Sequence, residues 1–284
     1  KHPCIQVIDL EHNLIGDNGG IALAELLRRN QNLKQIVLSY NRIGAKGIVA
    51  LAEQIRYHGN LQDVRFVSNH FGDEGAQAMG KALETNQSLT NLDLRRNMIS
   101  DIGADVIAKA LEKNQTLTHL NLSGNRIENS RFLPLAVKTN GILQSLNLSG
   151  LKLTAKFMSE LSDSIGKNER LRELDISYSS VTGLSAVEIL NQLLDHPNLL
   201  KLNLSRNQIG DITVKVLRDI FAQNSRIQSI DLEGNSFTSE GIIEIINGAQ
   251  ESKCLQYLNL KCNPGSRDCQ EAHLQSKSNF ILIQ

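Results

Sequence analysis

The chain has 284 residues, of which 40% are apolar, so it can bury a sizeable core. Thirty basic residues balance thirty acidic residues, and this neutrality excludes a global field that would attract nucleic acid or an anionic membrane. The sequence also lacks an apolar run long enough to span a bilayer. We therefore expect no nucleic-acid partner and no membrane insertion.

A short pattern recurs from one end of the chain to the other. Its clearest copy runs from Leu89 to Ile99 and reads L-x-x-L-x-L-x-x-N-x-I. The ten copies begin at Ile5, Leu33, Leu61, Leu89, Leu117, Leu143, Leu171, Leu199, Ile227 and Leu255. The period is 28 residues, except that the fifth copy is two residues shorter. This regularity predicts one repeat domain over residues 1–263 and leaves residues 264–284 as a C-terminal cap or tail.

Every copy predicts the same two elements in the same order. In copy four, Leu92 and Leu94 alternate with polar residues, which predicts a short strand. The apolar residues between Ile102 and Leu111 follow a helical spacing, and Ser100 or Asp101 can cap that helix. Alternating strands and helices make all strands parallel, and a helix is wider than a strand. The predicted fold is therefore an α/β solenoid, curved, with a parallel sheet on the concave face and helices on the convex face.

The turn after each strand carries an asparagine, such as Asn97, which can bond otherwise unpaired backbone groups. Copies six and seven depart from this rule, because Leu151 and Ser179 stand at the asparagine position. Copy five carries Pro134, which is acceptable only at the start of a helix. We therefore expect a local change of curvature through residues 125–181, in place of uniform helices and an unbroken turn.

The turn is followed by I-G-D/A-x-G at Ile15–Gly19 and Ile43–Gly47, with Phe71–Gly75 as a variant, and helices end in A-L-x-x-N. With the 28-residue period, these motifs resemble the ribonuclease-inhibitor-like class of leucine-rich repeats. The resemblance implies a protein-binding module rather than an enzyme. That class includes enzyme inhibitors, sensor arms of innate immune receptors, activators of the Ran GTPase, actin regulators and secreted bacterial effectors.

The third, fifth, seventh and eighth residues of each copy are predicted to line the concave face. Aspartate and asparagine dominate the fifth position and serine the seventh, so other residue types carry more information. The candidate partner-binding residues on this basis are Glu11, His12, Val37, Tyr40, Asp63, Arg65, Val67, Asp93, Arg95 and Arg96. Arginine and tyrosine are common interface anchors. The alternative is that the arginines only neutralise the neighbouring aspartates. The second choice of partner-binding residues is Tyr178, Lys201, Arg206, Glu233, Tyr257 and Lys261.

The sequence predicts no catalytic residue, metal or cofactor, and no small-molecule substrate. His12, His58, His70 and His119 lie in different copies, without a nucleophile at motif spacing. Near the C-terminus, Cys254, Cys262, Cys269 and His273 match no common zinc-ligand spacing. The cysteines also lack a disulfide pattern, which favours a reducing, cytoplasmic compartment.

We therefore expect a non-enzymatic module that binds a protein partner through its concave face and so inhibits or regulates an enzyme. One alternative is a regulator or activator of a small GTPase, although the acidic tail of the Ran activators is missing here. Another is a bacterial effector acting in a host cytoplasm, or the sensor portion of a larger receptor. For the tail, packing of Phe280–Ile283 on the last copy is the simplest expectation. A short partner-binding segment is the alternative.

Overall fold

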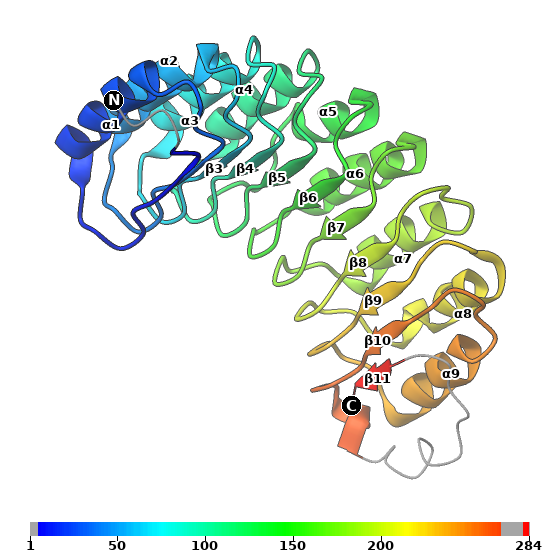
Figure 1. Ribbon diagram of the computed structural model, residues 1–284. Coiled ribbons are helices and arrows are strands. Elements are labelled where there is room, and N and C mark those ends of the chain that lie inside the picture. The colour runs from blue at the N-terminus through cyan, green and yellow to red at the C-terminus, as the bar shows by residue number, and fades with distance from the viewer. Residues whose placement is uncertain (1–4, 268–280, 284) are drawn as a thin grey trace. The chain divides into compact units, whose positions relative to one another are not determined.

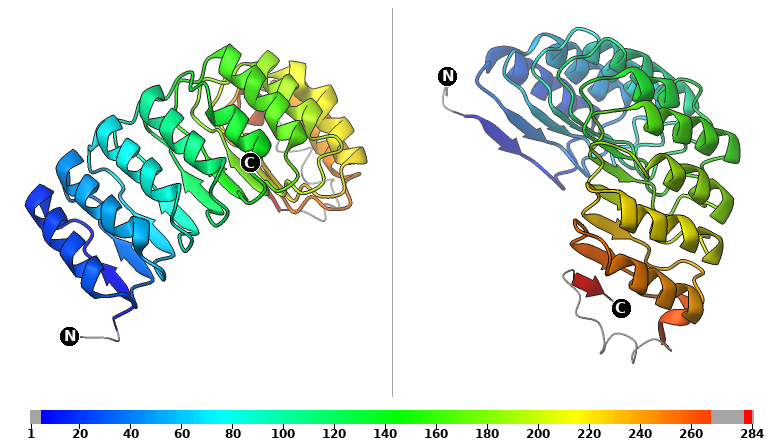
Figure 2. Two further views of the ribbon diagram at one scale, coloured as in Figure 1. Left: turned by 90° about the horizontal axis from the view of Figure 1, so that it is seen from above. Right: turned by 90° about the vertical axis from the view of Figure 1, so that its right-hand side faces the viewer.

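The computed structural model describes residues 5–267 and the backbone of residues 281–283. The chain divides between Asn147 and Leu148 into two compact units. In each unit short strands alternate with helices, and the helices cover one face of a parallel sheet (Figures 1 and 2). The predicted parallel α/β solenoid is confirmed.

The first unit contains six strands and five helices within its described residues. They are β1 (Val7–Asp9), α1 (Gly16–Arg29), β2 (Gln35–Val37), α2 (Ala45–Tyr57), β3 (Asp63–Arg65), α3 (Gly72–Leu83), β4 (Asn91–Asp93), α4 (Asp101–Leu111), β5 (His119–Asn121), α5 (Leu133–Thr139) and β6 (Ser145–Asn147). Neighbouring strands are parallel, and equivalent residues of successive copies pair, as Leu92 does with Val64 and Leu120. Side chains 28 residues apart therefore lie next to each other.

The second unit continues the same alternation. Its described elements are α6 (Ala155–Lys167), β7 (Glu173–Asp175), α7 (Gly183–Gln192), β8 (Lys201–Asn203), the 3-10 turn η1 (Asp211–Thr213), α8 (Val214–Gln223), β9 (Ser229–Asp231), α9 (Ser239–Ala249), β10 (Tyr257–Asn259), the 3-10 turn η2 (Pro264–Arg267) and β11 (Ile281–Ile283). The backbone of β11 pairs in parallel with β10. The connecting residues 268–280, including Phe280, lie outside the described residues, so the cap stays a prediction.

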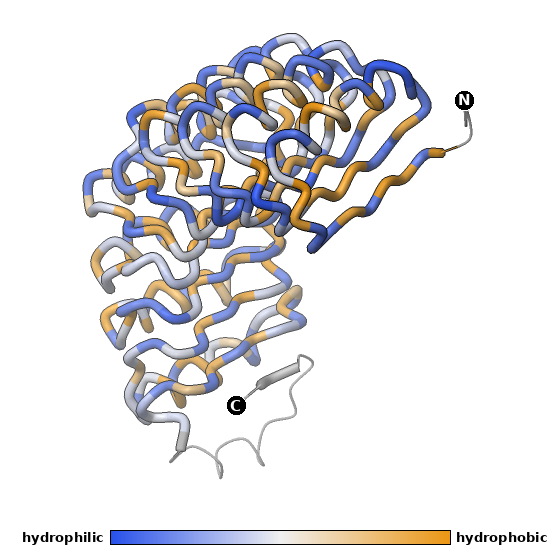
Figure 3. Tube along the Cα trace, turned by 90° about the vertical axis from the view of Figure 1, so that its left-hand side faces the viewer, coloured by the Kyte–Doolittle hydropathy of each residue, from blue (hydrophilic) through white to orange (hydrophobic). Residues whose placement is uncertain are grey.

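The core lies between the sheet and the helices of each unit. From copy two onward, the first, fourth and sixth residues of every copy are buried, as Leu89, Leu92 and Leu94 are in copy four. Apolar and polar segments alternate along the chain accordingly (Figure 3). Within residues 5–267, no helix is both long and apolar enough to cross a lipid bilayer.

A ladder of buried asparagines connects the turns that follow the strands. Asn97 donates from Nδ2 to the carbonyls of Phe66 (2.7 Å) and Leu94 (3.0 Å). Its Oδ1 accepts from the backbone amides of Asn69 (2.7 Å) and His70 (3.0 Å). Each asparagine therefore satisfies buried backbone groups of its own copy and of the preceding copy.

A second ladder connects the helix ends. Asn86 donates from Nδ2 to Ile55 O (2.7 Å) and accepts the Leu89 amide at Oδ1 (2.7 Å). His58 occupies the same position one copy earlier, where its Nε2 lies 2.9 Å from Asn30 O and its Nδ1 accepts the Leu61 amide. The imidazole thus reproduces both roles of the asparagine amide.

The irregular copies keep the fold by local substitutions. Pro134 lies in the first turn of α5, where its missing N–H has no helical partner to lose. Ser179 takes the asparagine position and donates from Oγ to Leu148 O (3.1 Å), while its amide binds Asn207 Oδ1. Leu151 is buried as an apolar residue. The boundary between the two units falls in the copy that contains Leu151.

Candidate partner-binding surface

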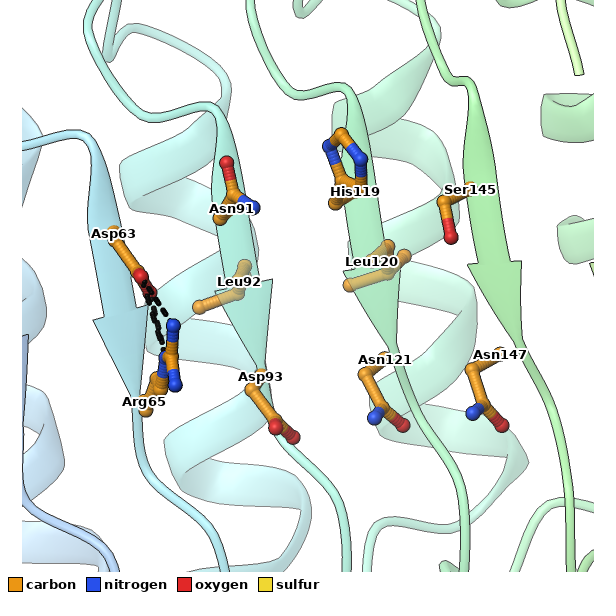
Figure 4. Close-up of a pocket in the computed structure, with 10 residues that line it drawn as sticks. All are labelled: Asp63, Arg65, Asn91, Leu92, Asp93, His119, Leu120, Asn121, Ser145 and Asn147. Atoms are coloured by element: carbon orange, nitrogen blue, oxygen red, sulfur yellow. Dashed lines mark hydrogen bonds and ion pairs between the residues drawn. The ribbon is translucent and has the colours of Figure 1, made fainter. Parts of the chain in front are cut away.

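The exposed face of the first unit's sheet, here called the strand face, carries a shallow hollow between β3 and β6. Asp63, Arg65 and Asp93 lie at one side of it, and His119 and Asn147 lie toward the other (Figure 4). The register explains this grouping, because Asp63 pairs with Asn91 and Asn91 pairs with His119. The third and fifth residues of successive copies therefore share one surface, as the sequence predicted.

Two arginines on this face form ion pairs with the aspartates two residues earlier in the chain. Arg65 Nη2 lies 2.8 Å from Asp63 Oδ2, and Arg95 Nε lies 3.1 Å from Asp93 Oδ2. The hydrogen bond to Asp63 raises the pKa of Arg65, and burial raises the pKa of Asp93. Both arginine side chains remain nearly half exposed. Exposed ion pairs of this kind contribute only ~0–1 kcal/mol to folding stability. Because the side chains stay exposed, the paired guanidinium groups remain accessible to a partner.

Two of the candidate residues are not on the surface. Val37 is 8% exposed and Val67 is 2% exposed, so the expectation that they line the concave face is wrong. Val37 lies between Asp9 and Arg65 in the sheet register, and these longer side chains flank it. Val67 is the seventh residue of its copy and lies in the turn that follows β3. Most of the seventh-position serines, including Ser39, are buried as well.

The eighth residue of each copy has a feature that the sequence did not reveal. All ten have positive φ angles, between 53° and 67°. Glycine, which adopts this conformation without strain, occupies the position only at Gly124, Gly150 and Gly234. The other seven copies place a side chain there at some conformational cost: His12, Tyr40, Ser68, Arg96, Tyr178, Arg206 and Cys262.

These eighth-position side chains lie against one another along the stack. The rings of His12 and Tyr40 are stacked, with centroids 4.3 Å apart and planes 7° from parallel. Arg96 lies over Gly124, where an added Cβ would come within 2.9 Å of the Arg96 Cγ. Glycine at position 124 therefore leaves room for the arginine. With Ser68 of copy three between Tyr40 and Arg96, the eighth positions of copies one to four form a row, and Glu11 and Arg95 directly precede His12 and Arg96 in the chain.

The second unit carries a comparable row. The Arg206 guanidinium lies 5.4 Å from the centre of the Tyr178 ring and forms an ion pair with Glu233. Asn259 Nδ2 donates to Glu233 Oε2 at 3.1 Å. Lys201 instead pairs with Glu173 at 2.7 Å. Of the second-choice residues, the structure brings Tyr178, Arg206 and Glu233 into contact.

Tyr257 and Lys261 complete the second-choice set. Burial raises the pKa of Tyr257, and the nearby Asp231 carboxylate acts in the same direction. Burial likewise raises the pKa of Asp231. Lys261 is exposed, and its backbone amide binds Asn259 Oδ1 at 3.1 Å. These residues belong to the strand face of the second unit.

Within the described residues, the histidines and cysteines that the sequence analysis considered are either in structural hydrogen bonds or exposed. His58 belongs to the helix-end ladder, while His70 and His119 are exposed. Cys254 is a free thiol whose Sγ lies 3.2 Å from Ile227 O, and Cys262 is free and exposed. Cys269 and His273 lie outside the described residues. Across residues 5–267, no three His, Cys, Asp or Glu side chains are grouped to hold a metal ion.

Comparisons with known proteins agree with this architecture. The Leucine Rich repeat family model matches residues 1–24, 29–52, 60–80, 85–108, 113–130 and 195–217. Mouse NACHT, LRR and PYD domains-containing protein 12 is 27% identical over 146 residues, which cover 50% of this chain and 14% of that protein. Mouse leucine-rich repeat and WD repeat-containing protein 1 is 35% identical over 97 residues, 34% of this chain and 13% of that protein. The chain thus matches less than a sixth of either relative.

A solved structure, that of a TLR13–ssRNA13 complex, shares the fold with a TM-score of 0.56 and 19% identity, over 92% of this chain and 36% of that chain. Parallel strand–helix copies joined by buried turn asparagines define the class of solenoid repeat proteins. Within that class, the matched repeats and the relatives identify a leucine-rich repeat protein of the ribonuclease-inhibitor-like type.

Proposed function

We propose that the chain is a non-enzymatic module that binds a protein partner on the strand face of its first unit. The observation that carries this proposal is the row of side chains at strained eighth positions. Glycine would be less strained at positions 12, 40 and 96, yet His12, Tyr40 and Arg96 are found there. Strain of this kind, when it is retained on a surface, favours a binding role over a structural one.

The composition of this surface fits a protein interface. The remaining candidate residues after Val37 and Val67 are removed are Glu11, His12, Tyr40, Asp63, Arg65, Asp93, Arg95 and Arg96. Arginine and tyrosine bury apolar area while they keep directional hydrogen bonds. The Arg65 and Arg95 ion pairs hold their guanidinium groups in place, which lowers the entropy lost on binding.

The names of the relatives favour one of the alternatives. Both combine leucine-rich repeats with other domains in one protein, NACHT and PYD in the first and WD repeats in the second. We infer that this module serves as the partner-sensing portion of a larger protein rather than as a free inhibitor. We further propose a cytoplasmic location, which the free thiols of Cys254 and Cys262 support.

The test is affinity purification with quantitative mass spectrometry on three proteins. They are the unchanged chain, Arg65→Glu with Arg95→Glu, and a control with Lys46→Glu and Lys81→Glu. The control lysines are exposed on α2 and α3, and their reversal changes the net charge equally. The proposal expects a partner that the control retains and the arginine variant loses, with unchanged melting temperatures. Equal retention by both variants would refute the strand face of the first unit as the binding surface. The next candidates would then be Tyr178, Arg206 and Glu233.

A further inference from the structure

Three arginines lie along the edge of the first unit that is formed by the turns after the strands. Arg96 occupies the eighth position of copy four, and Arg42 and Arg126 occupy the tenth position of copies two and five. All three are exposed. None of them forms an ion pair with another residue of the described first unit. We call Arg42, Arg96 and Arg126 the basic edge.

The charge around the basic edge is one-sided. On the adjoining strand face, the carboxylates of Asp63 and Asp93 are already paired with Arg65 and Arg95. Glu11 lies at the copy-one end of the row and Glu128 lies two residues beyond Arg126. Between these ends, the eighth and tenth positions of copies two to four carry Tyr40 and Ser68, which are half-buried, and Arg42, His70, Arg96 and Met98, which are exposed. This segment therefore presents positive charge without a carboxylate of its own.

Hydrogen bonds to neighbouring copies fix the backbone at each arginine. The amides of Asn41 and Ile43, which flank Arg42, both bind Asn69 Oδ1. The Arg96 amide binds Ser123 O (3.0 Å), and the Arg126 amide binds Ile99 O (2.7 Å). Only the side chains remain free to move, so binding of a ligand costs the conformational entropy of three side chains and not that of a loop.

The spacing of the basic edge sets the size of a ligand. Copies two to five are separated by three strand spacings, or ~14 Å at about 4.8 Å each. An extended peptide advances ~3.4 Å per residue, so about four residues of a partner would cross the edge. Arginine is suited to a carboxylate partner, because its planar fork can donate two parallel hydrogen bonds.

We propose that the basic edge binds a short acidic segment of the protein partner, in extended conformation, across the turns of copies two to five. This inference rests on the proposed function, since it names the chemistry of one part of that partner. The strand face would contact the folded body of the partner, and the basic edge would contact an acidic stretch beside it.

An acidic peptide fits this edge better than a nucleic acid does. Single-stranded nucleic acid is bound by a basic groove together with aromatic side chains on which bases stack. Here the aromatic side chain next to the arginines is that of Tyr40, which is half-buried, and one face of its ring is already covered by His12. Three arginines over ~14 Å also make a short track for a polyanion with a charge at every nucleotide.

The test uses fluorescence anisotropy with a labelled peptide of eight residues, Gly-Glu-Glu-Glu-Glu-Glu-Glu-Gly, at low and physiological salt. The variant is Arg42→Gln, Arg96→Gln and Arg126→Gln together. The matched control is Lys34→Gln, Lys46→Gln and Lys81→Gln, which removes the same charge from exposed positions elsewhere in the first unit. A labelled uridine octamer is the nucleic-acid probe. Circular dichroism melting establishes that both variants are folded.

The proposal expects the unchanged chain and the lysine control to bind the peptide alike and the arginine variant to bind about tenfold more weakly. Three results would overturn it: no peptide binding at low salt, equal weakening of both variants, or tighter binding of the uridine octamer through the same arginines. The Arg65 and Arg95 reversal separates this inference from the proposed function. A partner that is lost by that reversal but retained by a variant with only Arg42→Gln and Arg126→Gln, the two basic-edge residues outside the proposed strand-face surface, would leave the proposed function standing and refute only the binding of an acidic segment.

Discussion

The backbone amide of Asn69 donates to the side-chain oxygen of Asn97 at 2.7 Å, and this bond joins two buried turns that lie 28 residues apart in the chain. The backbone amide of Asn97 in turn donates to Asn125 Oδ1 at 2.9 Å. The ladder therefore does two things. It stabilises the stack of copies, and it fixes the backbone from which the eighth and tenth side chains project.

Replacement of Asn97 by alanine should strongly destabilise the first unit. The change leaves the carbonyls of Phe66 and Leu94 and the amide of Asn69 without their buried partner. Because each such group costs about 1–3 kcal/mol, we expect the free energy of unfolding to fall by ~3–5 kcal/mol in urea titrations. Asn13→Ala is the control, since Asn13 is exposed and should cost less than ~1 kcal/mol. Equal losses at both positions would contradict the ladder's role.

Arg96→Gly should separate stability from binding. The φ angle of Arg96 is 56°, so glycine removes conformational strain, and we expect an unchanged free energy of unfolding or a gain of up to ~1 kcal/mol. Affinity for the acidic peptide should fall. Arg95→Gly is the control, because Arg95 is not among the residues with positive φ and glycine should cost about 0.5–1 kcal/mol there. A clear loss of stability in Arg96→Gly would mean that the side chain is structural.

His196 should make the second unit sensitive to acid. It is buried in the helix-end ladder, where Nδ1 accepts the Leu199 amide at 3.0 Å. Burial lowers its pKa, opposed by the nearby carbonyls of Asn168 and Ile165. Nε2 nevertheless lacks a hydrogen bond of good geometry to any described residue, so we regard these carbonyls as neighbours and not as bonded partners.

The sign of this effect follows from the lowered pKa. Below the unfolded pKa of about 6.5, the unfolded chain binds a proton that folded His196 does not, so stability is complete above pH ~6.5 and falls as the pH drops toward the folded pKa. His196→Asn restores the usual ladder residue, seen at Asn224, which donates to Leu193 O and accepts the Ile227 amide. Urea titrations from pH 7.5 to 5 should show a flatter profile in the variant, by at most ~1.4 kcal/mol per pH unit. Identical profiles in the two proteins would exclude His196 as the cause of any loss of stability at acidic pH.

Gly80→Ala should destabilise the first unit although alanine favours helices. A Cβ at position 80 of α3 would lie 2.8 Å from Val106 Cγ1 and 3.1 Å from the Val106 carbonyl oxygen of α4. The overlap should outweigh the helix gain of about 1 kcal/mol and lower the free energy of unfolding by ~1–2 kcal/mol. Gly59→Ala has nothing within 4 Å and ordinary φ, so it should change stability by less than ~0.5 kcal/mol. A more stable Gly80→Ala protein would show that the helices can move apart.

Sequence reasoning located the elements well and the exposed side chains less well. The position of each strand followed from the spacing of leucines, because a buried strand residue must recur once per copy. Val37 and Val67 were misplaced, because exposure at the fifth and seventh positions depends on which neighbours flank them, and those neighbours come from other copies. From the sequence, His58 was considered as a catalytic candidate and dismissed, and the structure shows it as a buried substitute for asparagine. Its equivalence to Asn30 and Asn86 at the 28-residue period was the available signal.

The sequence by itself determined the repeat, the parallel register and the buried asparagine turn, since each depends on a pattern that returns every 28 residues. Only the tertiary structure decided which side chains share a surface. Arg42, Arg96 and Arg126 are separated by up to 84 positions in the chain, and stacking of the copies brings them to one edge. The left-handed conformation at Arg96 was likewise visible only in the folded turn, where hydrogen bonds from the next copy hold the backbone against its local preference.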